Sequence, residues 1–207
     1  MATGLKIGVL GAGQFASSFI PLFKAHPLVD EVVVAEAFPE RRAEQAARFG
    51  IVRTCASLDE LCQTDVDAIA IFTQRWLHAP QAIQALKAGK HVYSAVPAGV
   101  TVDEIGQLAD TVKSTGLTYM LGETSYYYPC TLYCRDRYAR GDFGLFVYGE
   151  AEYLHDMSHG FYEAYQHSGG AAWKSTASFP PMLYPSHSIS RIVSVTGARF
   201  TSVSCLG

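Results

Sequence analysis

The feature that most constrains the fold is a glycine-rich turn near the N-terminus. Leu5–Leu10 (LKIGVL) has the composition of a buried strand, and Gly11–Ala16 (GAGQFA) follows it and opens a helix over Gln14–Ala25. This spacing, G-x-G-x-x-G/A, permits a tight turn at its first glycine, and its second glycine lets a pyrophosphate approach the backbone at the helix N-terminus. The turn therefore predicts a dinucleotide site. Its expected contacts are Gly11, Gly13, Gln14, Phe15 and Ala16.

Strand-like and helix-like segments alternate with short connections through the first 121 residues. The expected strands are Leu5–Leu10, Glu31–Ala35, Ile51–Thr54, Ala68–Phe72, His91–Ser94 and Leu117–Leu121. The expected helices are Gln14–Ala25, Pro39–Phe49, a short helix capped by Ser57, Pro80–Ala88 and Thr101–Thr115. Such alternation is typical of an α/β fold with a doubly wound parallel sheet of the Rossmann type, which binds ligands beyond the carboxyl ends of its strands.

The pattern changes after residue 121, and eleven of the 12 tyrosines lie at or after Tyr119. We expect helices over Cys130–Arg140 and Ser186–Val195, and strands over Leu145–Leu154 and Phe200–Leu206. The sequence thus predicts a cofactor-binding domain over residues 1–121. Residues 122–207 are interpreted as the start of a second domain that is incomplete here, because its terminal strand has nothing after it to pair with.

Glu36 follows the second expected strand, 23 residues beyond Gly13. An acid at this place accepts a hydrogen bond from the 2′-hydroxyl of the adenosine ribose and repels a 2′-phosphate. No arginine follows immediately, because Ala37 and Phe38 come next. The sequence therefore favours NAD over NADP, the structural alternative being a tight turn followed by a surface glutamate.

Composition excludes several other classes of partner. Sixteen Lys and Arg against 19 Asp and Glu give a net charge of −3, which argues against nucleic acid and anionic membranes as partners. No apolar run approaches the roughly 20 residues of a membrane span. The N-terminus lacks the pattern of a signal peptide, so we expect a cytoplasmic protein. The five cysteines have no zinc-type spacing, nor do His155, His159 and His167, so no metal is expected.

Two further segments resemble the Gfo/Idh/MocA family, which includes glucose–fructose oxidoreductase and inositol dehydrogenase. Thr73–His78 (TQRWLH) is similar to the family's T-P-x-x-x-H segment, and Ala88–Val92 (AGKHV) matches its A-G-K-H-V segment. The resemblance implies an NAD-dependent oxidation of a carbohydrate or polyol hydroxyl, with Thr73 and His78 beside the cofactor. It also implies a second α/β domain whose open sheet often pairs between subunits, so a homo-oligomer is a possible assembly.

The sequence departs from that family at two catalytic positions. Where the family has E-K-P, this chain has Ala95-Val96-Pro97, so Val96 replaces the lysine. The aspartate that often precedes the family's catalytic histidine by four residues is Leu183, and the histidine itself corresponds to His187.

Three short segments instead resemble the family's branch of NAD-dependent glycosidases. They are Val96–Ala98 (VPA), Tyr153–Asp156 (YLHD) and Tyr184–His187 (YPSH). That resemblance implies oxidation of a sugar hydroxyl, elimination of the aglycone, addition of water and return of the hydride. It makes His187, Tyr153 and His155 the candidate catalytic residues, with proton transfer as their role. A dehydrogenase, an NAD-dependent glycosidase and a non-catalytic NAD-binding protein all stay open.

For the weaker candidates, packing in the core or exposure to solvent is the alternative to a functional role. Asp156 has the chemistry to orient a ring, and Lys174 to replace the missing lysine. Arg75 and Trp76 are candidate cofactor contacts. Glu123 with Tyr126-Tyr127-Tyr128 follows the last expected strand and suits a sugar ring, although three adjacent tyrosines cannot all face one way.

Overall fold

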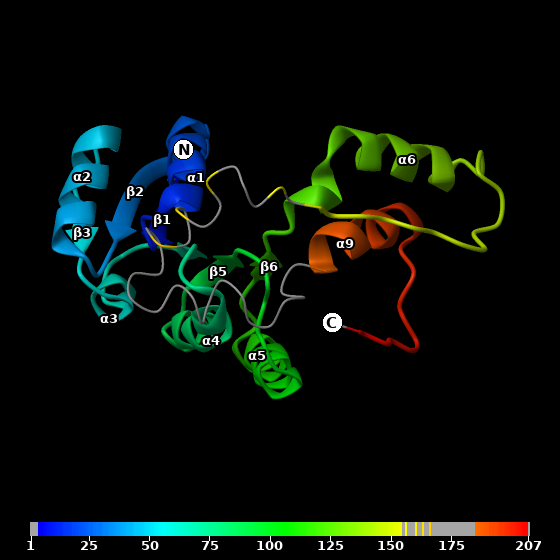
Figure 1. The fold of residues 1–207 in the computed structure, drawn as a ribbon. Helices are drawn as coiled ribbons and strands as arrows, with labels where there is room; N and C mark the ends of the chain where they lie inside the picture. The colour runs from blue at the N-terminus through cyan, green and yellow to red at the C-terminus, as the bar shows by residue number, and fades with distance from the viewer. Residues whose placement is uncertain are drawn as a thin grey trace.

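The computed structural model describes residues 4–154, 156, 160, 163, 166 and 185–206. Its centre is a six-stranded parallel sheet in the order β3-β2-β1-β4-β5-β6 (Figure 1). The strands are β1 (Leu5–Leu10), β2 (Val29–Ala35), β3 (Thr54–Cys55), β4 (Ala68–Ile71), β5 (His91–Ser94) and β6 (Tyr119–Leu121). The chain runs outward from β1 in both directions, so the carboxyl end of β1 is the switch point where such sheets bind ligands. The predicted Rossmann-type fold is confirmed.

Helices cover both faces of the sheet. They are α1 (Gln14–Ala25) and α2 (Pro39–Phe49) on one face, and α3 (Leu58–Cys62), α4 (His78–Lys87) and α5 (Val102–Thr115) on the other (Figure 1). Both faces of β4 are buried, because Ile69 and Ile71 belong to the apolar cluster under α3, α4 and α5, while Ala70 belongs to the cluster under α1. A strand buried on both faces reads as a continuous apolar run, as this one does.

Local signals set several boundaries as expected. The hydroxyl of Thr101 accepts a hydrogen bond from the Glu104 N–H, and the Glu104 carboxylate accepts one from the Thr101 N–H, which completes a capping box at the start of α5. Helix α4 begins at His78, two residues before the predicted start at Pro80, because the first turn of a helix tolerates a proline. The strand expected at Ile51–Thr54 lies instead at Thr54–Cys55, where the backbone pairs with the end of β2.

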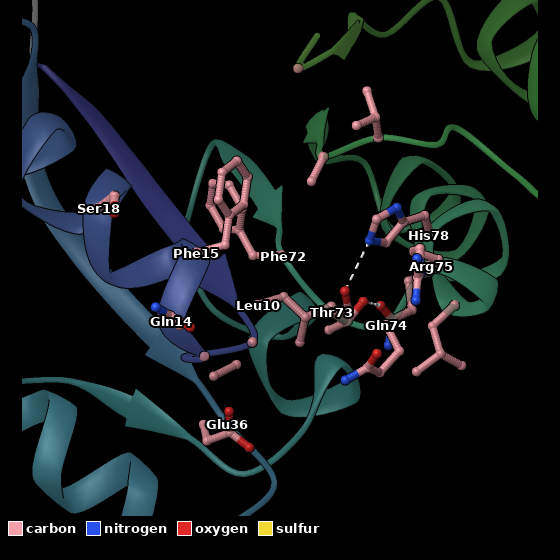
Figure 2. Close-up of a pocket in the computed structure, with 18 of the residues that line it drawn as sticks. Leu10, Gln14, Phe15, Ser18, Glu36, Phe72, Thr73, Gln74, Arg75 and His78 are labelled. Carbon is pink, nitrogen blue, oxygen red and sulfur yellow. Dashed lines mark hydrogen bonds between the residues drawn. The ribbon is translucent and has the colours of Figure 1, made fainter. Parts of the chain in front are cut away.

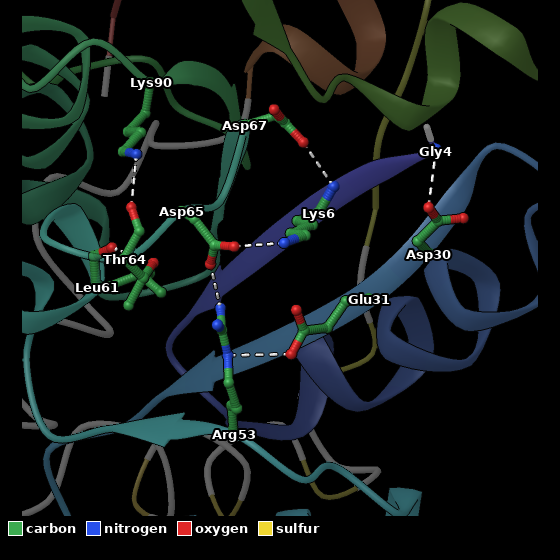
Figure 3. A network of polar contacts seen from close by, with 10 residues as sticks. All are labelled: Gly4, Lys6, Asp30, Glu31, Arg53, Leu61, Thr64, Asp65, Asp67 and Lys90. Atoms are coloured by element: carbon green, nitrogen blue, oxygen red, sulfur yellow. Dashed lines mark hydrogen bonds and ion pairs between the residues drawn. The ribbon is translucent and has the colours of Figure 1, made fainter. Parts of the chain in front are cut away.

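A polar network covers the amino ends of the central strands, opposite the switch point (Figure 3). Lys6 and Arg53 both bind the Asp65 carboxylate, and Arg53 also lies 3.0 Å from Glu31. Asp65 is 53 % exposed, and exposed pairs contribute little to stability. The network therefore joins the ends of β1, β2 and β4 at the edge of the sheet opposite the switch point.

Beyond β6 the chain forms a separate helical layer beside the sheet (Figure 1). It consists of η2 (Thr124–Tyr127), α6 (Pro129–Ala139) and α9 (Pro185–Thr196), which pack on one another. Arg135 of α6 donates to the Tyr126 carbonyl oxygen at 2.9 Å and to Ser194 of α9, which ties the three elements together. None of the helices in the described part of the chain is long and apolar enough to cross a membrane.

The strands predicted over Leu145–Leu154 and Phe200–Leu206 are wrong. Both segments are irregular and lie outside the sheet, with Leu145 86 % and Val203 74 % exposed. Alternation places the apolar side chains of an extended segment on one face, but a strand also needs a neighbouring strand for its backbone hydrogen bonds. The described residues supply no such neighbour beside either segment.

Candidate functional site

A cavity of about 860 Å³ lies along the carboxyl edge of the sheet. Its walls come from the turn after β1, the end of β2, the loops after β4 and β5, the segment after β6 and the start of α9. Figure 2 shows Glu36 on one side of the turn after β1, with Thr73, Arg75 and His78 across the pocket. Ligand sites commonly have volumes of roughly 300–1,000 Å³, so the cavity has room for an extended cofactor.

The glycine turn has the geometry that a pyrophosphate needs. Gly11 has φ +85°, and a Cβ atom there would lie 3.0 Å from the Phe72 carbonyl oxygen. Gly13 is the N-cap of α1 and supplies no side chain to the first N–H groups of that helix. Both glycines line the cavity, as do Gln14 and Phe15. Ala16 is fully buried in the core under α1, so its contribution is close packing of the helix on the sheet.

Glu36 lies at the end of the cavity nearest α2, and both of its carboxylate oxygens are engaged. Oε2 accepts a hydrogen bond from the Ala12 N–H at 2.9 Å, and Oε1 accepts one from the Phe38 N–H at 3.1 Å. Each oxygen keeps a second lone pair that can accept from a ribose hydroxyl. The carboxylate therefore fastens the glycine turn to the end of β2 and remains suited to a ribose.

An arginine missed by the sequence reasoning also reaches this end of the cavity. Arg41 Nη1 lies 3.8 Å from Glu36 Oε2, and its guanidinium lies 5.0 Å from the centre of the Phe38 ring. The sequence argument considered only the residues immediately after Glu36. No arginine follows Glu36 immediately in the sequence, but the first turn of α2 brings Arg41 back to the carboxylate.

His78 joins the two loops in the middle of the cavity. Its Nδ1 lies 2.8 Å from the Pro97 carbonyl oxygen and its Nε2 lies 3.0 Å from the Thr73 carbonyl oxygen (Figure 2). Burial lowers the pKa of the His78 imidazole, so the neutral ring is favoured. Val96, in place of the family's lysine, lines the cavity beside this histidine.

The loop between β4 and α4 also carries the two weaker cofactor candidates. The buried Arg75 lines the cavity, whereas Trp76 is 37 % exposed on the same short helix, η1 (Arg75–Leu77). The structure therefore brings Arg75 to the site, whereas Trp76 is not among the described residues that line the cavity.

The far end of the cavity holds a buried carboxylate–imidazole pair. His187, in the first turn of α9, has its Nδ1 2.7 Å from Glu123 Oε1, and Glu123 also accepts from the Ser125 N–H at 2.9 Å. Burial acts to raise the pKa of the Glu123 carboxyl, but the hydrogen bonds from His187 and Ser125 outweigh it and hold the pKa below its usual value. The Tyr153 ring lies 4.4 Å from the His187 ring, centre to centre.

Some of the other predicted site residues lie among the residues that the structure describes, and some lie outside them. Tyr126 and Tyr127 pack on each other with ring centres 5.0 Å apart, while Tyr128 lines the cavity, so the three tyrosines do face different ways. Asp156 is exposed. The candidates outside the described residues are His155, Lys174, Leu183 and Tyr184.

Sequence reasoning assigned Glu123 to substrate hydroxyls and did not connect it with His187. Its position directly after β6 placed it at the correct edge of the sheet. The two residues are 64 positions apart, so no local pattern shows that they meet.

The sequence profile of a known protein family matches the first part of this chain. The profile is Gfo/Idh/MocA, described as an oxidoreductase family with an NAD-binding Rossmann fold, and it matches residues 5–123.

Individual relatives and solved structures extend the comparison. A glycosyl hydrolase family 109 protein of Shewanella amazonensis is 28% identical over 195 residues, which cover 89% of this chain and 43% of the relative. The structure of scyllo-inositol dehydrogenase from Lactobacillus casei with bound NAD(H) and scyllo-inositol has a TM-score of 0.63 at 23% identity, over 68% of this chain and 42% of that one, which shows the shared fold.

A third comparison is with a solved structure that contains NADP. A 3-ketoreductase from Actinomadura kijaniata, in complex with TDP-benzene and NADP, has a TM-score of 0.61 at 26% identity, over 67% of this chain and 44% of that one. The chain therefore spans less than half the length of each of these three proteins.

Proposed function

Since the chain belongs to the Gfo/Idh/MocA family of oxidoreductases with an NAD-binding Rossmann fold, we propose that it oxidises a hydroxyl group of a carbohydrate or polyol with NAD. The observation that carries this proposal is one continuous cavity that runs from Glu36 and the glycine turn to His187 and Tyr153. Residues 1–121 would hold the cofactor, and residues 122–207 would contribute the substrate side. Cytoplasmic location and a homo-oligomer stay predictions from the sequence.

The residues present fit a dinucleotide cofactor. Gly11 and Gly13 line the cavity, and the N–H groups that begin α1, which have no side-chain cap, would bind a pyrophosphate. Glu36 favours NAD because a carboxylate accepts from the ribose diol and repels a 2′-phosphate. Gln14, Phe15, Thr73 and His78 complete the proposed cofactor contacts. When bound, NAD accepts a hydride from the substrate carbon.

Proton transfer is assigned to the far end of the cavity. His187 would take the proton of the substrate hydroxyl, because an imidazole in contact with a carboxylate is an effective general base near neutral pH. Tyr153 lies against the same ring and would donate to the substrate oxygen. His155 is kept as a third candidate on the strength of the resemblance alone. With Val96 in the lysine's place, His187 carries the general-base role.

A glycosidase that uses NAD catalytically is the second candidate function. It is favoured by the glycosyl hydrolase family 109 relative, whose similarity covers 89% of this chain. In that reaction a sugar hydroxyl is oxidised, the aglycone is eliminated, water adds and the hydride returns to the sugar. The same cavity and the same base serve both reactions, but only the first leaves reduced NAD.

One experiment on the purified protein separates the candidates. The protein is denatured, and the supernatant is assayed for NAD and NADH. Stoichiometric retained cofactor favours the closed cycle of the glycosidase, to be followed by a screen of aryl glycosides. An empty protein that binds added NAD favours the dehydrogenase, to be followed by a screen of inositols and free sugars for NADH formation.

The His187→Gln variant gives the control for both screens. It is expected to bind NAD as the wild type does and to lose turnover by about 10²- to 10⁴-fold, the usual contribution of general acid–base catalysis. Full activity in this variant would refute the assignment of His187. Binding of NAD without either activity would indicate a cofactor-binding protein, and failure to bind NAD would refute the proposed function itself.

A further inference from the structure

We infer that Glu123 is a positioning residue, which fixes His187 in the tautomer that carries its proton on Nδ1 and its lone pair on Nε2. The inference rests on the proposed function, in which His187 accepts the proton of a substrate hydroxyl. In a chain that lacks the family's lysine and aspartate, Glu123 is the group that makes His187 a base.

The geometry of the pair supports this role. His187 Nδ1 and Glu123 Oε1 are 2.7 Å apart, a distance typical of a charge-assisted hydrogen bond. Both residues are buried, at 9 % and 5 % exposure, so solvent does not compete for the contact. Glu123 is itself fixed by the Ser125 N–H, and His187 by its place in the first turn of α9.

The chemistry of the two groups determines which nitrogen carries the proton. An ionised carboxylate only accepts hydrogen bonds, and its low pKa keeps Glu123 ionised at neutral pH. A neutral imidazole has one N–H, so the contact with Glu123 places that hydrogen on Nδ1. The lone pair is then on Nε2, the nitrogen suited to accept a proton from the substrate.

The carboxylate also balances the charge that the reaction creates. When the substrate is oxidised, its O–H bond would break and the proton would move to Nε2, while its C–H bond would break and the hydride would pass to the nicotinamide cofactor that the glycine turn and Glu36 would hold, leaving a C=O bond. His187 becomes a cation, and the Glu123 carboxylate 2.7 Å away stabilises it. No lysine is among the described residues that line the cavity, so this pair replaces the lysine as the means of holding the proton.

Glu123 also has a structural role that must be separated from the positioning role. It precedes η2, and its side chain accepts the Ser125 N–H that begins that turn. Glutamine keeps an oxygen that can accept this hydrogen bond, and it removes the charge. Both contacts use the same atom, Glu123 Oε1, so a glutamine that keeps the Ser125 contact also keeps an acceptor at Nδ1. Glu123→Leu removes that acceptor, so it is the variant that tests the tautomer. A merely structural role predicts no change in the tautomer.

The test is ¹⁵N NMR of histidine-labelled protein, at a pH where the imidazoles are neutral, with the His187→Gln spectrum identifying the His187 signals. We expect wild-type His187 to carry its proton on Nδ1. We expect Glu123→Leu to populate the Nε2–H tautomer, because no acceptor then faces Nδ1. Glu123→Gln keeps an oxygen there and is expected to keep the wild-type tautomer, as is the control Glu150→Gln, which changes an exposed carboxylate hydrogen-bonded to Tyr148. A proton on Nε2 in the wild type would overturn the inference, and so would a Glu123→Leu spectrum that matches the wild type.

Kinetics give a second and separable readout. Glu123→Gln is expected to lower kcat by about 10²-fold or more, the lower limit of general-base catalysis, while the Kd for NAD changes less than about twofold. If Glu123→Leu fails to fold, the wild-type tautomer alone decides the question. If no sugar or polyol is turned over, the proposed function fails, and the NMR result still stands or falls by itself.

Discussion

Removal of the charge on Glu36 is expected to shift cofactor preference from NAD toward NADP, because a cation is already in place. Glu36 Oε2 lies 3.8 Å from Arg41 Nη1, at the end of the cavity where the adenosine ribose would lie. In the wild type, a 2′-phosphate would meet both the carboxylate and the guanidinium. Glu36→Gln removes the negative charge of the carboxylate and keeps the guanidinium.

The magnitude follows from two interactions. A hydrogen bond to a charged acceptor contributes about 1.5–3 kcal/mol, so loss of the ribose contact weakens NAD binding roughly 10- to 150-fold. A carboxylate about 5 Å from a phosphate costs roughly 3 kcal/mol per unit charge at an effective dielectric constant of about 20, so its removal strengthens NADP binding by about 100-fold or more. The ratio of the two dissociation constants is therefore expected to change by at least about 10³-fold.

Calorimetric titration with NAD and with NADP measures both constants. Glutamine retains an oxygen that can accept the Ala12 N–H, so the turn is expected to remain folded, and circular dichroism checks this. Arg48→Gln is the matched control, because Arg48 lies on the same helix but contacts Phe49 outside the cavity. A double variant, Glu36→Gln with Arg41→Gln, should lose the gain for NADP.

Either of two results would refute the reasoning about this end of the cavity. One is a Glu36→Gln variant that binds NAD as tightly as the wild type, since Glu36 would then make no contact with the ribose. The other is an unchanged NADP affinity, since the carboxylate would then not be what opposes the phosphate.

Three further predictions concern stability and the turn. Gly11→Ala is expected to weaken NAD binding and lower Tm, because φ is +85° and the new Cβ would lie 3.0 Å from the Phe72 carbonyl oxygen. The control Gly106→Ala, which has open space around it in α5, should instead stabilise the protein by about 0.5–1 kcal/mol. Equal effects of the two substitutions on Tm would contradict the argument. Leu61→Ala is expected to cost about 2–5 kcal/mol by urea unfolding because Leu61 is fully buried, whereas Leu22→Ala, at 63 % exposure, should cost far less; a small loss at Leu61 would show that the core closes around the gap. Because the pKa of Glu123 is lowered in the folded protein, its contribution to the free energy of unfolding is present above the ordinary pKa of 4.5 and is lost as the pH falls through the pKa of the folded state. The difference in the free energy of unfolding between wild type and Glu123→Gln should therefore shrink below about pH 5. A difference that does not change with pH would argue against the Glu123–His187 pair.

Residues 4–121 and the remainder of the described chain differ in how far the sequence predicted them. In the first, apolar runs, the glycine turn and the capping pair Thr101–Glu104 are local signals, and the structure follows them closely. In the remainder, the alternating segments at Leu145–Leu154 and Phe200–Leu206 were predicted as strands and are irregular. Alternation sets which side chains share a face, but it does not supply the neighbouring strand on which a sheet depends.

The sequence by itself determined the Rossmann-type sheet, the glycine turn and the place of Glu36, because these depend on contacts between residues close in the chain or on a motif of fixed spacing. Only the tertiary structure decided what surrounds the reacting groups. It placed Arg41 beside Glu36 through a helical turn, and it paired Glu123 with His187 across 64 residues. Such pairs form where the ends of distant elements meet at one edge of the sheet, and the periodicity of each element carries no information about the distance between them.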